Sequence, residues 1–183
     1  MKTTHWILAG VLLSSIAATG CLQSGQFTVS ADLPDPLSGS SSTTITPAQI
    51  DLNSESIYTD HKSDLQGLVD CAILGEFTNN SPGPMNVTVW MTPGNTNHTT
   101  QGALNGDATK LQLWGPFALG TGATKVQIKW DDSAGLFDDA GKAALINEVK
   151  GDGTFTLYAV GASAPYSITI TKGVAVLTID AGK

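Results

Sequence analysis

The stretch that decides the fold reads Val69-Asp70-Cys71-Ala72-Ile73-Leu74-Gly75-Glu76-Phe77. Most of its apolar side chains recur at every second position, which is the pattern of a β-strand with one buried face. A cluster of Asn, Ser, Pro and Gly at 79–84 predicts a turn, and residues 85–91 alternate again, with Trp90 on the polar face. We therefore expect two antiparallel strands joined as a hairpin.

The same alternation continues along the chain on both sides of this pair. It predicts further strands at 27–33, 44–52, 110–119, 123–130, 154–160 and 166–179. Pro47 places one of them at an edge, Gly115-Pro116 interrupts another, and Lys172-Gly173 predicts a bulge in the last. Residues 37–43 are Ser- and Gly-rich and predict a loop, and residues 60–64 predict a turn or one helical turn. The total is about seven or eight strands.

One segment has helical signals instead. Asp138 and Asp139 favour a helix start, and Lys150 with Gly151 favours its end. The fold class we expect is therefore all-β: an antiparallel two-sheet β-sandwich, Ig-like or jelly-roll-like, with one short crossover helix near 139–149.

Charge excludes several classes of partner. The chain has nine Lys, no Arg and 16 acidic residues, which gives a formal net charge of −7. Nucleic-acid recognition depends on Lys and Arg to neutralise phosphates, so we expect no nucleic acid as a partner. The Lys residues form no run that would dock on anionic lipid headgroups, and the excess of acid favours solubility.

The N-terminus has the features of an export signal. Lys2 precedes an apolar run at 6–18, and the small residues Thr19 and Gly20 stand before Cys21. Such a run is too short to span a bilayer stably and predicts a signal peptide over residues 1–20.

Ala18-Thr19-Gly20-Cys21 resembles the lipobox of bacterial lipoproteins, with Ala18 where Leu is usual. The resemblance implies that Cys21 is acylated and becomes the first residue of the mature protein; cleavage nearby by a conventional signal peptidase is the alternative. Several acyl chains make anchoring effectively permanent, because each buried methylene contributes about 0.8 kcal/mol. Leu22, where an Asp would retain the protein at the inner membrane, implies the outer membrane. We expect residues 21–25 to form a short tether to a sandwich domain over 26–183.

Cys71 then has no cysteine left to pair with in the mature chain. Its position on the apolar face of a predicted strand indicates a buried side chain that packs as a small hydrophobe. No basic residue stands beside it to stabilise a thiolate, so a nucleophilic role is the weaker interpretation.

Residues suited to catalysis are sparse. His61 and His98 lie in polar segments without another His or a Cys at zinc-ligand spacing. The sequence has no nucleophile elbow, phosphate-binding loop or dinucleotide fingerprint. We therefore predict no catalytic residues and no enzymatic activity.

Two features are candidates for binding. Four carboxylates around one loop, Asp131, Asp132, Asp138 and Asp139, make a weak calcium candidate, although their spacing is not that of an EF-hand. No other cofactor is expected. Trp90, Trp114 and Tyr158 fall on the polar faces of their strands, where exposed rings would stack on a sugar or a partner. The competing interpretation is that these rings are covered by loops or fill the second face.

These observations predict a lipid-anchored envelope lipoprotein with a non-catalytic binding or structural role. Its expected partners are the bilayer, through Cys21, and an envelope protein or polysaccharide. Two alternatives remain open. A carbohydrate-binding accessory module would need two or more of the three rings on one open surface, and a hydrolase would need His61 or His98 beside a carboxylate or hydroxyl within a cleft.

Overall fold

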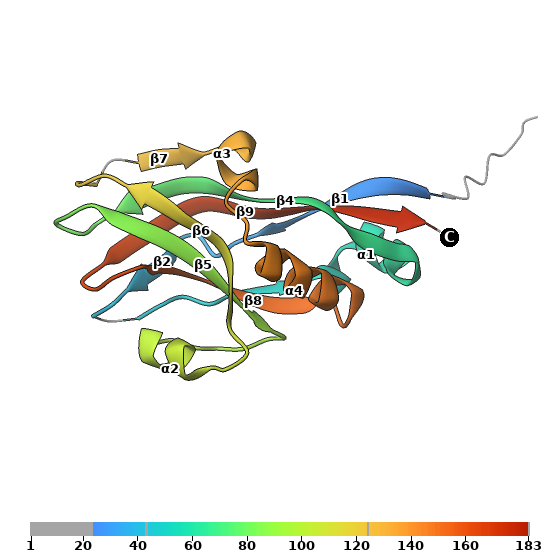
Figure 1. The fold of residues 1–183 in the computed structure, drawn as a ribbon, viewed down its shortest axis with the longest axis horizontal. Coiled ribbons are helices and arrows are strands. Elements are labelled where there is room, and N and C mark those ends of the chain that lie inside the picture. Colours follow the sequence, from blue (N-terminus) through green and yellow to red (C-terminus); the bar gives the residue numbers. More distant parts are fainter. Residues whose placement is uncertain (1–23, 43, 124, 183) are drawn as a thin grey trace, which may run out of the picture.

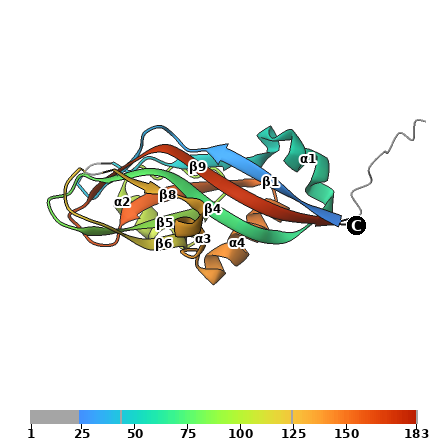
Figure 2. The same cartoon turned by 90° about the horizontal axis from the view of Figure 1, so that it is seen from above.

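Two antiparallel sheets pack face to face around one hydrophobic core in the computed structural model (Figure 1 and Figure 2). The structure describes residues 24–42, 44–123 and 125–182. The predicted signal peptide, Cys21 and the beginning of the predicted tether lie outside the described residues. The expected all-β sandwich is confirmed.

The first sheet is built around its two longest strands. Its members are β1 (Ser24–Asp32), β2 (Leu37–Ser40), β4 (Leu65–Asn79), β7 (Lys125–Ile128) and β9 (Ser167–Gly182). The strand order is β1-β9-β4-β7, and β2 also pairs with β9. The long strands β4 and β9 therefore form the centre, and the shorter strands attach to them.

The second sheet has four strands. They are β3 (Ala48–Asp51), β5 (Met85–Pro93), β6 (Leu111–Leu119) and β8 (Thr154–Gly161), in the order β3-β8-β5-β6. The strands β4 and β5 thus belong to different sheets, and the expected hairpin between them is wrong. Alternation identifies a strand and its buried face, but it does not identify the partner strand. The turn at 79–84 instead crosses from one sheet to the other, and the Asn79 side chain donates to the carbonyls of Gly83 and Gly120.

Nine strands are present in the described residues, more than the expected seven or eight, and the predicted boundaries needed two main corrections. Residues 37–43 were expected to be a loop, yet Leu37–Ser40 pairs with β9, because Leu37 is buried opposite Ile170. The strand expected at 123–130 ends at Ile128, and Trp130 begins a helix.

The predicted crossover helix is confirmed as α4 (Asp139–Lys150). The Asp138 carboxylate accepts hydrogen bonds from the backbone N–H groups of Ala140 and Gly141, which satisfies donors at the helix start. The chain crosses here from the first sheet to the second. Leu145 and Val149 are buried against the sandwich.

The expectation of a single helix was wrong for the described residues. Other helical segments are η1 (Leu52–Ser54), α1 (Ser56–His61), η2 (Lys62–Asp64), α2 (Gln101–Gly106) and α3 (Trp130–Ala134). Each has six residues or fewer, too short for apolar periodicity to reveal it. The helical turn expected within 60–64 is confirmed by α1 and η2.

The predicted bulge in β9 is confirmed. Leu74 pairs with Val174 but Glu76 pairs with Thr171, so Lys172 and Gly173 together face Gly75. Gly75 has a φ of +149°, and a Cβ there would lie 3.2 Å from the Gly173 Cα, so a side chain does not fit easily.

An ion pair spans the strands beside the bulge. The Glu76 carboxylate lies 2.8 Å from the Lys125 ammonium on β7 and 2.6 Å from that of Lys172 on β9. Hydrogen bonds from Lys125 and Lys172 lower the pKa of Glu76 to about 2. The charges therefore join three neighbouring strands where the register changes.

Cys71 lies in the core, as expected from its strand pattern. Its side chain is fully buried on β4, opposite Leu177 of β9. Burial raises the pKa of the thiol to about 12, so the reactive thiolate is scarcely populated at neutral pH.

Replacing Cys71 with Ser should lower the free energy of unfolding by about 1 to 3 kcal/mol, because a hydroxyl would enter an apolar interior. Cys71→Ala should lower the free energy of unfolding by a smaller amount. Denaturant unfolding of the three proteins measures the difference. Rapid modification of the native thiol by a maleimide would contradict the buried placement.

Candidate functional site

Trp90 projects from the outer face of the second sheet. It lies on β5 between two cross-strand neighbours, Gln112 of β6 and Tyr158 of β8. The Trp90 side chain is partly exposed. This was predicted, because Trp90 alternates with the apolar residues of its strand. It is therefore accessible to a ligand.

Tyr158 and Trp114 are not accessible, and their expected role in stacking is not supported by their positions. Both side chains are fully buried. The Trp114 ring packs 5.7 Å from that of Phe77, and its indole N–H donates to Ser133 of α3. Tyr158 lies beneath the segment that joins β5 to β6. The competing interpretation, that these two rings are covered, is the correct one, so the condition set for a carbohydrate-binding accessory module, two or more rings on one open surface, is not met.

The segment that covers Tyr158 is fixed by a chain of hydroxyl groups. The Tyr158 hydroxyl lies 2.7 Å from the Thr96 hydroxyl, which is also bonded to that of Thr92. The His98 N–H donates to the same Tyr158 oxygen, and the Thr156 hydroxyl donates to the Gly94 carbonyl. Residues 94–98 are thereby held against β8.

A hydrogen bond between His98 and Asp107 joins two more positions of the same segment. His98 Nε2 lies 2.8 Å from Asp107 Oδ2, across the two ends of α2. Asp107 Oδ1 also accepts from the Thr109 hydroxyl and N–H. Hydrogen bonds from Thr109 and His98 lower the pKa of Asp107 to about 2. Both side chains are mostly covered, with exposed fractions of 25% and 14%.

A hydrolase would need His61 or His98 beside a carboxylate or hydroxyl within a cleft, and the His98–Asp107 pair meets only the first part of this condition. His98 lies beside a carboxylate, but neither His98 nor Asp107 is among the residues that line four pockets of the described part of the chain. His61 lies on α1, with its ring 5.4 Å from that of Phe27. The His98–Asp107 hydrogen bond joins the two sides of α2.

A pocket of about 360 Å³ lies beside Trp90, between α2 and the outer face of the sheet. Gln101 and Asn105 of α2 form one wall, and Gln112 forms another. The rest of the lining is Thr88, Trp90, Val160, Gly161 and Ala162. The lining thus combines an aromatic ring with three amides and contains no charged side chain.

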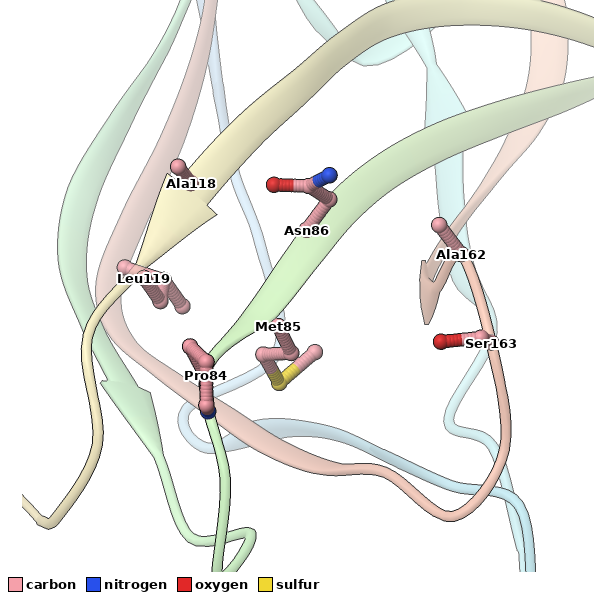
Figure 3. Close-up of a pocket in the computed structure, with 7 residues that line it drawn as sticks. All are labelled: Pro84, Met85, Asn86, Ala118, Leu119, Ala162 and Ser163. Atoms are coloured by element: carbon pink, nitrogen blue, oxygen red, sulfur yellow. The ribbon is translucent and has the colours of Figure 1, made fainter.

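Two further pockets lie at the end of the sandwich where the turns gather. Figure 3 shows residues that line one hollow, among them Met85 and Asn86 of β5 and Ser163 of the β8–β9 turn. Its volume is about 230 Å³. A neighbouring hollow of about 400 Å³ is lined by hydroxyl-rich segments around Ser41, Asn80 and Tyr166. Short polar side chains and prolines dominate the larger hollow, whereas Met85, Leu119 and two alanines give the smaller one a mostly apolar lining.

The four carboxylates of the calcium candidate do not form a common site. Asp132 Oδ2 accepts from the Lys129 N–H at the start of α3, and Asp138 caps α4. No cluster of three or more potential metal ligands occurs within 24–42, 44–123 and 125–182.

Sequence reasoning missed the amide wall of the Trp90 pocket and the pairing of His98 with Asp107. The signal for the wall was Thr100, whose hydroxyl accepts from the Ala103 N–H and begins α2. No sequence pattern indicated the His98 pair, because the two residues meet only when α2 folds.

Replacing Asp107 with Asn should lower the free energy of unfolding by about 1 kcal/mol at neutral pH, because charge-assisted hydrogen bonds are lost. The ionised Asp107 stabilises the fold fully above its unfolded pKa near 3.8, and this stabilisation disappears as the pH falls through about 2.

The measurement is denaturant unfolding of both proteins between pH 7 and pH 2. The difference between them should shrink as the pH falls. A difference that stays constant across this range would show that the Asp107 charge does not hold the segment.

No helix within the described residues is long and apolar enough to cross a membrane. No protein-family model matches the chain, and no curated protein matches it. Among solved structures, a chain of Desmodium yellow mottle tymovirus is 11% identical; the match covers 98% of this chain and 90% of that chain, with a TM-score of 0.26.

Proposed function

We propose that the protein is a lipid-anchored module of the bacterial cell envelope that binds another envelope component without catalysing a reaction. The lipobox-like sequence ending at Cys21 supports the anchor. The pocket beside Trp90 and the hollows among the turns offer binding surfaces.

The observation that supports the proposal most directly is that the two ends of the sandwich differ: the first strand begins at one end, and the turns gather at the other. Ser24 begins β1 and pairs with Gly182 at the end of β9, with α1 beside them (Figure 2). From Gly182, β9 runs 16 residues back to Ser167, a distance of about 50 Å at the usual rise of an extended strand. Ser24 therefore lies at one end of the sandwich, the entry end, and the turns that join β4 to β5 and β8 to β9 lie at the other (Figure 1). Residues of these turns line the two hollows.

Acylation of Cys21 would place the two ends of the sandwich at different heights above the membrane. Ser24 follows three residues later, so the anchor would hold the entry end within about 10 Å of the bilayer surface. The opposite end would then point away from that membrane. A module held in this way meets neighbouring proteins or polymers more readily than it captures a diffusing substrate.

The absence of a catalytic role is part of the proposal. The His98–Asp107 pair is the arrangement closest to an acid–base unit that we find among the described residues, and it lies outside the pockets. General acid–base catalysis needs such a group within reach of bound substrate.

Replacing Cys21 with Ala should abolish acylation and release the protein from membranes. The test is fractionation of cells that express each protein, followed by a high-salt wash. A Cys21→Ser variant serves as the matched control and should behave like Cys21→Ala. Retention of both variants in the washed membranes would refute the anchor.

The purified protein should show no turnover of ester, peptide or glycoside substrates above background. A His98→Ala variant should give the same background rates, as should His61→Ala. Product formation that disappears with either histidine would establish a hydrolase and exclude the non-catalytic role.

A further inference from the structure

We propose that the pocket beside Trp90 is a binding site for a neutral saccharide, with one indole ring and the amide walls taking the place of the two-ring surface expected of an accessory module. This inference deepens the proposed function, because it rests on a binding role and names the ligand class.

The Trp90 ring is held in one orientation before any ligand arrives. Its indole N–H donates to the Thr88 hydroxyl at 3.2 Å, and that hydroxyl lies 3.4 Å from the Val160 carbonyl. Thr88 is itself buried, so its hydroxyl does not exchange freely with water. A ring fixed in this way loses little conformational entropy on binding.

A cation fixes the ring from a second direction. The Lys110 ammonium lies 4.9 Å from the centre of the Trp90 ring, within the range of a cation–π interaction. Asn105 of α2 accepts a hydrogen bond from the same ammonium at 2.8 Å. The ring is thus linked to α2, which the His98–Asp107 pair fastens at its two ends.

The other walls supply hydrogen-bonding groups without net charge. Each of Gln101, Asn105 and Gln112 offers a carbonyl oxygen and an NH₂ group, so each can both donate and accept. Gln112 donates to the Gly115 carbonyl at 3.0 Å, which directs its amide and leaves its oxygen free of that bond. Hydroxyl groups, which also both donate and accept, are their natural complement.

A sugar ring fits this combination. Its C–H face is apolar and packs on an aromatic ring, while the hydroxyls at its edge bond to amides. The pocket volume of about 360 Å³ is near the lower end of the usual range for small-molecule sites, about 300 to 1,000 Å³. The lining residues carry no charge, and the Lys110 ammonium beside them is already bonded to Asn105 and lies over the ring, so the groups left for a ligand are amides, which match neutral sugars.

The test uses the full-length protein in a detergent that has no sugar headgroup. Neutral oligosaccharides of glucose, mannose, galactose and N-acetylglucosamine are titrated, with uronic-acid and sulfated oligosaccharides in parallel. Affinity is measured by calorimetry, and contact is measured by the NMR shift of the Trp90 indole N–H.

At least one neutral series should bind and shift the Trp90 signal. Trp90→Ala should weaken that binding by about tenfold or more, and Trp90→Phe should weaken it less, because a smaller ring remains. Asn105→Ala should also weaken it. Ile57→Ala, which changes a 41% exposed apolar side chain on α1, is the matched control and should leave affinity unchanged.

Three results would overturn the inference: no neutral series binds, only acidic sugars bind, or binding is undiminished in folded Trp90→Ala. If Trp90→Ala fails to fold, the affinities of Trp90→Phe and Asn105→Ala still test the site. Undiminished affinity in both variants would contradict it. Loss of the membrane anchor or cleavage of the bound sugar would instead count against the proposed function and leave the binding site standing.

Discussion

β4 and β9 pair along almost their whole lengths, from Leu65 opposite Ala181 to Asn79 opposite Ile168. Every other strand of the first sheet attaches to one of these two, so the register of this pair sets the positions of β1, β2 and β7. The bulge at Lys172-Gly173 is one of three places where that register shifts, and Glu76 bridges Lys125 and Lys172 there. The length of β9 is also what separates the entry end of the sandwich from its turns.

The second sheet depends on a different constraint, the covering of Tyr158. The segment from Gly94 to Asp107 lies over that ring and is tied to it through Thr96 and His98. This covering buries one aromatic ring and leaves the neighbouring Trp90 partly open, with α2 as the wall of its pocket. A change that loosens the segment, such as loss of the Asp107 charge, would therefore alter the pocket without touching Trp90.

Alternation along the chain was sufficient to predict most strands, the core position of Cys71 and the bulge in β9, because these depend on local pattern. It failed where the answer depended on distant residues. The pairing of β4 with β9 rather than β5 joins segments about a hundred residues apart, as in Cys71 with Leu177. Likewise, alternation assigns Trp114 and Tyr158 to polar faces. Register shifts between β5 and β6 instead place Trp114 opposite Val89 and against Phe77 in the core, and the covering segment buries Tyr158.

The orientation of the sandwich relative to the membrane can be measured directly on acylated protein in lipid vesicles. Ser63, in η2 at the entry end, and Ser163, in the turn at the other end, are both exposed and can each be changed to Cys and labelled with a dye, while Cys71 is buried. Energy transfer to acceptor dyes on the lipid headgroups reports the height of each label above the bilayer. We expect strong transfer from position 63 and weak transfer from position 163, since about 50 Å of strand separates the two ends. Equal transfer from both positions, or stronger transfer from position 163, would contradict an upright, lipid-anchored module.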